Sequence, residues 1–484
     1  MRRALLSSVA MFATLLPLQA SAADVSEAGA REIVDKLTYY LPKDIVDTGF
    51  LKVTAGTNRY ELSIDIQPLL RDVDKTKFSI TGLKPFVQYL TPQDDGLWKL
   101  ESSDRLNVSG QIDADGKKTS FTYIIDKIEG SALFDPALMF TRSADVKFEN
   151  LKVTTETGPA RVEATMQSYS GTTTTSNING GVVDLVSVMS GAGLNETITD
   201  PASGEVNITV ASMDGRAQMD RVGIVALRDL IVFGLNKWKA KVDKLTPEDS
   251  IKLKALIKAN VPFVDNLVED IQFHDVKVKA QGLEGGFDQL GYKFDFNGIK
   301  ANTRAGFEVN VENPRVPMGI LPPGTEAAVP QTASMGVAVT GLNLEGVASY
   351  LVEHADFTKS EPLTPEQSTE LGRIVLPGGM MNIEFYNVAA KSAVYDLSLS
   401  GTMKVNPDNS DKPVADVTIT AKDLDKTVKY LQDNSKTVPE FGQASFMVLM
   451  MKGFGEASPD GSMVWNVKLD EAGKVLINGR EMPQ

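Results

Sequence analysis

The feature that most constrains the fold of this 484-residue chain is the alternation of apolar and polar residues in short stretches separated by turn residues. A period of two places successive side chains on opposite faces of a strand, so these stretches indicate half-buried antiparallel strands. Gly and Asp-Gly at the turns favour tight hairpins, because such turns need positive φ at their central residues. The Thr- and Asn-rich stretch 172–179 is expected to be an exposed loop. Four hairpins are predicted, with turns at residues 56–58, 113–116, 214–215 and 471–473.

Short amphipathic helices are expected to interrupt the strands. Residues 26–41 carry an apolar stripe at helical spacing that ends before Pro42. Thr246-Pro247-Glu248 offers a capping residue followed by proline at the first helical position, and Thr364-Pro365-Glu366 repeats it. Thr91-Pro92-Gln93 is a near copy of the same signal. The sequence therefore predicts an α+β fold of mainly antiparallel β-sheets with short amphipathic helices packed on them.

A stretch at residues 337–351 recurs at residues 417–431 with a constant offset of 80 positions. Both copies end in Tyr-Leu, and residues 78–90 carry a shorter version. Similarity at a fixed period signals repeated structural units. We therefore expect an internal duplication, in which a strand is followed by a helix, a second helix and further strands.

Three parts are predicted along the chain: a signal peptide at residues 1–22, an N-terminal β-rich domain at residues 23–204, and a C-terminal α+β domain at residues 205–484. The last would hold the repeated strand-helix-helix-strand modules. The length suits about two to four domains of roughly 100–200 residues each. Five prolines fall within residues 313–332. Proline cannot continue a sheet, so this stretch is expected to be a long surface loop or a lid.

The N-terminal segment has the anatomy of an export signal. Arg2 and Arg3 precede the apolar residues 4–18, and the small residues Ala20-Ser21-Ala22 follow, which predicts cleavage between Ala22 and Ala23. The apolar stretch is shorter than the ~20 residues that a spanning helix needs, so no transmembrane anchor is expected after cleavage. A chain of this size can bury a core without disulfides. We therefore expect an acidic, cysteine-free protein of the Gram-negative periplasm.

Composition excludes several chemistries. The chain has no cysteine and only two histidines, His274 and His354, which rules out thiolate nucleophiles, iron–sulfur clusters and cysteine-ligated zinc. A formal charge of -14 argues against a nucleic-acid partner, which needs clustered Lys and Arg. No G-x-S-x-G, H-E-x-x-H or phosphate-binding glycine motif occurs. We therefore predict no catalytic residue, no cofactor and no metal site.

Methionines gather near the C-terminus, in the most apolar run of the chain after the signal segment. The flexible thioether of methionine adapts to irregular apolar ligands and surfaces. A helix buried under the sheet is the simpler interpretation of this run, and the functional alternative is an apolar groove for an acyl chain or a protein partner. On that alternative the candidate ligand-binding residues are Met380, Met381, Phe446, Met447, Met450 and Met451.

The closing segments, GSMVWNVKL at residues 461–469 and GKVLING at residues 473–479, predict a hairpin that ends in Asn-Gly. Together with the export signal and the strand-rich body, they resemble an uncharacterised family of proteobacterial periplasmic proteins, distantly similar to YdgA and the AsmA-type envelope proteins. The resemblance implies a role in the cell envelope and supplies no catalytic residues. AsmA-type proteins typically carry a transmembrane anchor, which is not expected here.

Two classes of function stay open. The first is an exported protein without catalytic machinery that binds an apolar, lipid-like ligand or supports envelope assembly, with a lipid or an envelope protein as its partner. The second is a periplasmic hydrolase of envelope glycans or esters that uses carboxylates whose pairing the sequence does not specify. Adjacent carboxylates such as Asp94-Asp95 and Glu269-Asp270 could serve it, although in an acidic chain the simpler interpretation is that they are solvated.

Overall fold

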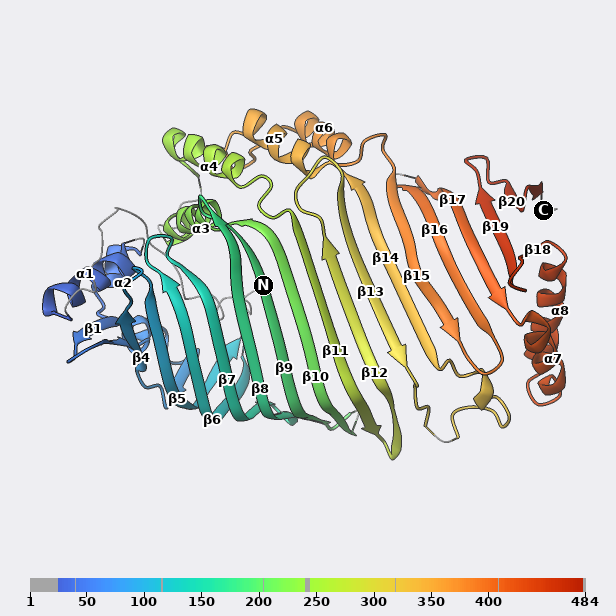
Figure 1. Ribbon diagram of the computed structural model, residues 1–484, viewed down its shortest axis with the longest axis horizontal. Helices are drawn as coiled ribbons and strands as arrows, with labels where there is room; N and C mark the ends of the chain where they lie inside the picture. The colour runs from blue at the N-terminus through green and yellow to red at the C-terminus, as the bar shows by residue number, and fades with distance from the viewer. Residues whose placement is uncertain are drawn as a thin grey trace. The chain divides into compact units, whose positions relative to one another are not determined.

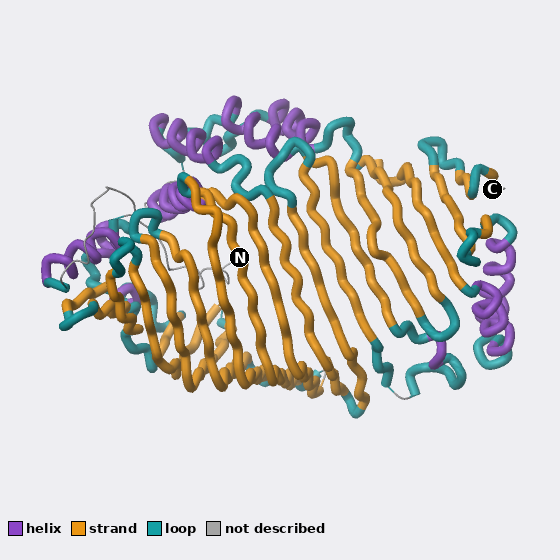
Figure 2. The backbone as a smooth tube through the Cα atoms, in the orientation of Figure 1, coloured by secondary structure: helices purple, strands orange, loops and turns teal. Residues whose placement is uncertain are grey.

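The computed structural model describes residues 25–39, 41–114, 116–202, 204–239, 244–317, 319–407 and 409–481. The predicted signal peptide and its cleavage site at Ala22 and Ala23 lie outside the described residues. Among the described residues, 21 strands form a large antiparallel sheet (Figures 1 and 2). The antiparallel pairing is as predicted, but the α+β class is wrong, because the helices do not form a layer packed on the sheet.

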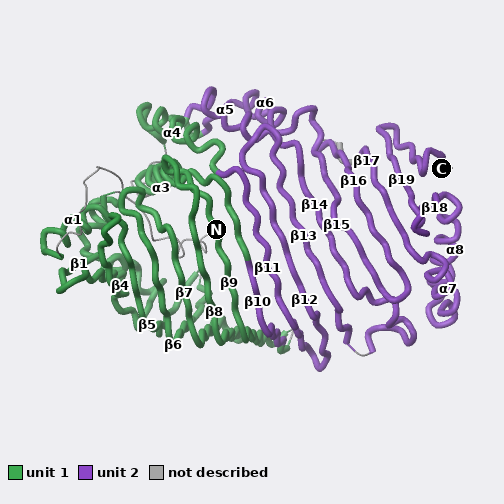
Figure 3. The backbone as a smooth tube through the Cα atoms, in the orientation of Figure 1, with its two compact units in different colours: residues 1–205, 216–263, 357–360 green, residues 206–215, 264–356, 361–484 purple. Residues whose placement is uncertain are grey.

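The chain divides into two compact units (Figure 3). The first unit holds residues 1–205, 216–263 and 357–360, and the second holds residues 206–215, 264–356 and 361–484. Strand β10 (Gly204–Gly223) contributes residues to both. Residues 204–223 were expected to turn at Asp214-Gly215. That hairpin is wrong, because the strand continues through both residues.

The first unit is built from strands that pair with their neighbours in the chain. β1 pairs with β2, β2 with β4, and β4 with β5, and the strands from β5 to β9 then follow in order, while β3 adds to β5. The predicted hairpins at residues 56–58 and 113–116 are confirmed. The elements are α1 (Glu27–Thr38), α2 (Lys43–Val46), β1 (Leu51–Ala55), β2 (Tyr60–Ile64), η1 (Gln67–Leu70), β3 (Phe78–Thr81), β4 (Phe86–Pro92), β5 (Trp98–Ala114), β6 (Lys117–Asp135), β7 (Phe140–Thr157), β8 (Ala160–Asn179), β9 (Val182–Asp200), α3 (Ile224–Lys239) and α4 (Pro247–Ala259).

A closed core lies where α1 covers the first strands. Ser26 caps α1 by accepting a hydrogen bond from the backbone N–H of Gly29 at 3.1 Å. Ala30 and Ile33 of α1 are buried against the strands, and Leu90 of β4 is completely buried beneath them. The N-terminal core, as we call it, consists of Ala30, Ile33, Tyr60, Leu62, Leu90, Trp98, Phe134 and Met139.

Two further predictions for the first unit are wrong. Residues 172–179, expected to be a loop, form the end of β8, where threonine suits a strand because it is β-branched. Their hydroxyls bond across the sheet: Thr172 donates to Asp145 at 2.7 Å, and Thr173 lies 2.8 Å from the Ser187 hydroxyl. Thr91 and Pro92 close strand β4 and do not start a helix. Residues 78–90 are likewise strands β3 and β4, so this shorter copy of the repeat lacks the helix.

The long strands of the first unit bend along their length. Asn150, inside β7, has φ 54, a left-handed conformation that a short polar side chain tolerates. Around this point the spacing of apolar residues changes from two to three, as in Phe148 and Leu151 of β7 and in Ile125 and Ile128 of β6. In Figure 1 the far parts of these strands, drawn paler, run behind the near parts. The sheet of this unit is therefore strongly curved.

In the second unit, strands β11 to β17 pair in chain order, and β19, β20 and β21 follow. The predicted closing hairpin at residues 471–473 is confirmed by the pairing of β19 with β20. The elements are β11 (Asn266–Ala280), β12 (Leu283–Phe296), β13 (Thr303–Glu312), η2 (Glu326–Ala328), β14 (Thr332–Leu342), α5 (Leu344–His354), α6 (Pro365–Val375), β15 (Met381–Lys391), β16 (Asp396–Asn406), β17 (Asn409–Lys422), α7 (Leu424–Asn434), α8 (Glu440–Lys452), β18 (Glu456–Ala457), β19 (Met463–Leu469), β20 (Val475–Ile477) and β21 (Arg480–Glu481).

The order of elements in the second unit follows the 80-residue offset. β14 leads into α5, and β17 leads into α7 at the corresponding positions, with a second helix after each. The duplication itself stays a prediction. The described part of residues 313–332 is mainly loop, with only the short η2 turn.

The helices are capped as the sequence predicts, but they pack on one another. Thr246 caps α4 by accepting from Asp249 N–H at 3.1 Å, and Thr364 forms a reciprocal capping box with Gln367 at the start of α6. The pairs α3–α4, α5–α6 and α7–α8 make the main helix–helix contacts. α5 and α6 lie beyond the ends of β14 and β15 (Figure 1). These pairs, together with the separate places where α1 and α8 contact strands, do not form a continuous helical layer over the sheet. Within the described residues, no helix combines the length and the apolar character needed to cross a membrane.

Candidate functional site: the apolar face of the sheet

The registers of the second unit define one continuous apolar face. Directly opposite residues in antiparallel strands share a face of the sheet. Two neighbouring cross-strand rows on the same face run through β12, β13, β14, β15, β16, β17 and β19. We call them the apolar rows: one consists of Phe294, Phe307, Val337, Phe385, Gly401, Val417 and Val467, and the other of Phe296, Ala305, Val339, Ile383, Met403, Ala415 and Leu469.

The apolar rows are partly open to solvent, and their β19 end is covered, where Val467 packs in the set around Trp465. None of their residues is buried, and the Phe307 side chain is 50% exposed. Met335, on the same face beyond Phe307, is 61% exposed. An antiparallel sheet ordinarily packs its apolar face against a core. A contiguous apolar surface that stays exposed marks a site of interaction.

The opposite face of the same strands is polar and bonded within itself. Arg304 contacts the carboxylates of Asp295 and Glu384, the second at 3.0 Å, and its guanidinium lies 4.7 Å from the centre of the Tyr386 ring. Burial raises the pKa of Tyr386 above its usual value. Gly306 makes room for this cluster, because a Cβ there would lie 2.3 Å from an Asp295 oxygen. On these strands the polar face is therefore held by contacts among its own side chains.

The first unit also has an apolar face and a polar face, over fewer strands. Leu106, Ile125, Leu151 and Met166 form an apolar cross-strand row over β5 to β8, and none of them is buried. On the same strands, Phe148 and Tyr169 stand opposite each other and stack at 4.8 Å. The other face carries ion pairs, among them Lys152–Glu163 at 2.8 Å and Arg161–Glu163 at 2.8 Å. Hydrogen bonds from Lys152 and then Arg161 lower the pKa of Glu163.

The predicted methionine site is divided between two places. Helix α8 exposes Phe446 (67%), Met447 (53%) and Met450 (47%). Met451, on the other side of the helix, packs against Trp465 and its neighbours, and the Trp465 indole donates to the Met451 carbonyl at 2.7 Å. A helix buried under the sheet is therefore wrong, since α8 is covered on one side only.

Met381 begins β15 and Met380 precedes it. Met381 stands opposite Val405, one step beyond the Ile383–Met403 pair, and so extends the apolar face. Helix α8 packs against the end of β17, and β16 separates β17 from β15. The structure thus places Met381 on the sheet and the four other residues, Phe446, Met447, Met450 and Met451, on α8.

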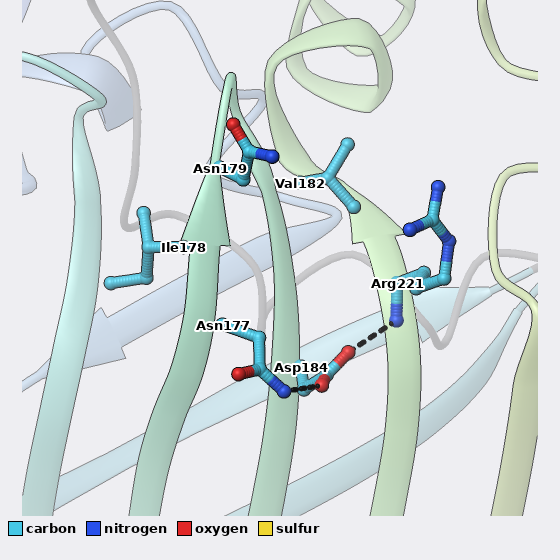
Figure 4. Close-up of a pocket in the computed structure, with 6 residues that line it drawn as sticks. All are labelled: Asn177, Ile178, Asn179, Val182, Asp184 and Arg221. Carbon is cyan, nitrogen blue, oxygen red and sulfur yellow. Dashed lines mark hydrogen bonds between the residues drawn. The ribbon is translucent and has the colours of Figure 1, made fainter.

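A polar pocket of about 650 Å³ lies at the turn between β8 and β9, beside β10 (Figure 4). Its centre is Asp184, which accepts hydrogen bonds from the side-chain amide of Asn177 and from the backbone N–H of Arg221. These bonds, the first being the larger cause, lower the pKa of Asp184. The bonds of Asp184 hold the hairpin tip in place. These groups therefore serve the structure of the turn, and we do not take the pocket as a catalytic site.

The titratable candidates from the sequence serve structural contacts. His274 Nε2 lies 3.2 Å from an Asp214 oxygen, and His354 stacks near Tyr350 in the last turn of α5. Asp95 accepts the Leu97 N–H within its own turn. Glu269 and Asp270 are successive residues of β11 and therefore face opposite sides. Within the described ranges, no three metal-ligating side chains come together.

The apolar rows escaped sequence reasoning, although their residues are visible in it. Alternation marks each strand, but the rows arise only when the register of seven strands is known. No protein-family model, curated protein or solved structure matches the chain. The resemblance to YdgA and the AsmA-type proteins stays a hypothesis. The fold and the site define a class by themselves: an antiparallel β-sheet protein with an uncovered apolar face.

Proposed function

We propose that the protein binds the acyl chains of lipid-like molecules on the apolar rows, as an exported envelope protein without catalytic machinery. The observation that supports the proposal most directly is the continuity of the rows. Fourteen positions over seven strands carry an apolar side chain or glycine, and none of the fourteen residues is buried.

The dimensions suit a hydrocarbon chain. Seven strands at about 4.8 Å spacing give a strip about 29 Å long, and the two rows lie about 7 Å apart along the strands. One leaflet of a bilayer has a hydrocarbon layer of about 15 Å, half of the roughly 30 Å core. An extended acyl chain therefore fits within the length of the strip and, lying between the two rows, contacts both.

The chemistry of the rows also favours hydrocarbon. Their side chains offer no hydrogen-bond donor or acceptor, which an acyl chain does not require. Covering them removes apolar area from water, which stabilises the complex by about 25 cal/mol per Å². Glu269 stands opposite Phe294, so a carboxylate marks the β11 end of the first row. The carboxylate pairs that favoured a hydrolase do not converge, and no observation favours that alternative.

The test measures binding of a fluorescent fatty acid to the full-length exported protein. Replacing both Phe307 and Phe385 by serine places two hydroxyls in the row, and we expect binding at least ~10-fold weaker. Ile320→Ser is the matched control, because Ile320 is 55% exposed but lies in the loop before β14. The control variant should bind as the unmodified protein does. Equal binding by the double variant, or no binding by the unmodified protein, would refute the proposal.

A further inference from the structure

We propose that α8 is a membrane-docking helix whose exposed apolar side seats in the headgroup–acyl boundary of a lipid bilayer. The inference rests on the proposed function and names the bilayer surface as the source of the acyl chains. Its contact residues are Phe446, Met447, Leu449 and Met450.

The first observation is that α8 is apolar on both of its sides. Residues 446–451 are all apolar, and a helix that is apolar all round is ordinarily buried. Here Val448 and Met451 pack inward, while Phe446, Met447, Leu449 and Met450 have exposed fractions from 44% to 67%. One side of the helix thus has its core, and the other lacks a cover.

The second observation is that α8 continues the apolar face of the sheet. Val448 and Met451 belong to the same packed set as Ile419, Met463 and Val467 of β17 and β19. Val467 is also the last member of an apolar row. The inward side of α8 therefore adjoins the end of the rows at Val467.

The size and chemistry of the exposed side favour a bilayer over a protein partner. Taking about 200 Å² for each large side chain, the exposed fractions correspond to roughly 400 Å². A stable protein interface buries about 800 Å² on each partner and draws its strongest contacts from Trp, Tyr and Arg. The four residues supply none of these types. Phe, Leu and Met need only hydrocarbon, which the interfacial region of a membrane provides.

The charges around α8 are compatible with an anionic membrane. Residues 424–452 carry four lysines and three acidic residues, whereas the whole chain has a formal charge of -14. Lys426 and Lys436 are exposed, and Lys452 at the end of α8 lies beside Asp425. Lysine side chains near a membrane extend their ammonium groups to the headgroups. This helix pair thus carries one more basic than acidic residue, so an anionic surface does not repel it.

The test is flotation of the full-length exported protein with vesicles of phosphatidylethanolamine and phosphatidylglycerol. We expect the unmodified protein to float with the vesicles and a Phe446→Ser/Met450→Ser variant to lose at least ~10-fold in vesicle partitioning. Ile251→Ser is the matched control, because Ile251 is 70% exposed on α4, and it should partition as the unmodified protein does. Thermal melts of the three proteins should agree, since all the replaced side chains are exposed.

Fatty-acid binding separates this inference from the proposed function. The Phe446→Ser/Met450→Ser variant should still bind monomeric fluorescent fatty acid, whereas Phe307→Ser/Phe385→Ser should still float. Unchanged vesicle partitioning of the α8 variant, or absence of vesicle binding by the unmodified protein, would overturn the docking role. A dimer that the α8 variant dissociates, without vesicle binding, would overturn it in favour of a second copy of the chain.

Discussion

The N-terminal core and the apolar rows are made of the same kinds of residue and differ in their cover. Leu90 is completely buried beneath α1, whereas Phe307, a larger apolar residue, is 50% exposed. Both belong to alternating strands of antiparallel sheet. Apolar alternation therefore specifies a strand face, and the position of a helix decides whether that face becomes a buried core or stays partly exposed.

The largest expected difference is in stability. Leu90→Ala should lower the free energy of unfolding by about 2–5 kcal/mol, because it leaves a cavity under α1. Phe307→Ala should lower it by less than about 1 kcal/mol, because water already reaches that side chain. Urea denaturation of both variants measures the difference. Similar losses would mean that the apolar rows are covered in solution.

Helix α8 allows the same comparison within one turn. Met451→Asp should destabilise the protein by about 2–4 kcal/mol, since Met451 packs against Trp465 and its neighbours and a carboxylate there has no partner. Met450→Asp should cost less than about 1 kcal/mol, because Met450 is 47% exposed. Thermal melts compare the two. A large loss for Met450→Asp would contradict the open side of the helix and with it the docking inference.

The packed polar face of the second unit can be compared with the open surface of helix α6 through glycine. Gly306→Val should lower the free energy of unfolding by about 1–3 kcal/mol, because its Cβ would meet the Asp295 carboxylate and the Tyr386 hydroxyl. Gly372→Ala is the control, since a Cβ there meets nothing within 4 Å and alanine favours helix α6 by about 0.5–1 kcal/mol. Denaturation midpoints should move in opposite directions. A neutral Gly306→Val would show that the polar cluster is loosely packed.

The smallest effect concerns pH at the β8–β9 hairpin tip. Hydrogen bonds hold the pKa of Asp184 below its unfolded value, so its contribution to stability is present above the unfolded pKa, near ~3.9, and is lost as pH falls through the folded pKa. Asp184→Asn should therefore show a slightly smaller decrease in melting temperature between neutral and strongly acidic pH than the unmodified protein. An identical pH profile would mean that the bonds to Asn177 and Arg221 do not persist in solution.

Local chemistry made part of the fold predictable. Thr246-Pro247 and Thr364-Pro365 start helices as predicted, because a capping hydroxyl and an N1 proline act within one turn. The hairpins at residues 56–58 and 113–116 follow from their turn residues. Asp214-Gly215 fails as a turn because these residues also fit an extended strand, and only the neighbouring strands decide between the two.

The candidate site was less predictable, because it depends on whether another element covers an apolar face. The sequence identified Phe446, Met447 and Met450 as apolar, but not that α8 leaves them exposed. Phe294, Phe307, Val337 and Phe385 lie far apart in the chain and form one row only through strand registers. Neither exposure nor register has a signal within a single element.

Because the strands of the second unit pair in chain order, the strip formed by its apolar rows can be lengthened. Each strand from β11 to β16 pairs with the next strand along the chain, as the units of a repeat protein do. Inserting one further hairpin with matched alternation would lengthen the strip by about 9.6 Å without disturbing the strands on either side. The length of the apolar strip is thus set by the number of hairpins, a change of size that a closed core does not permit.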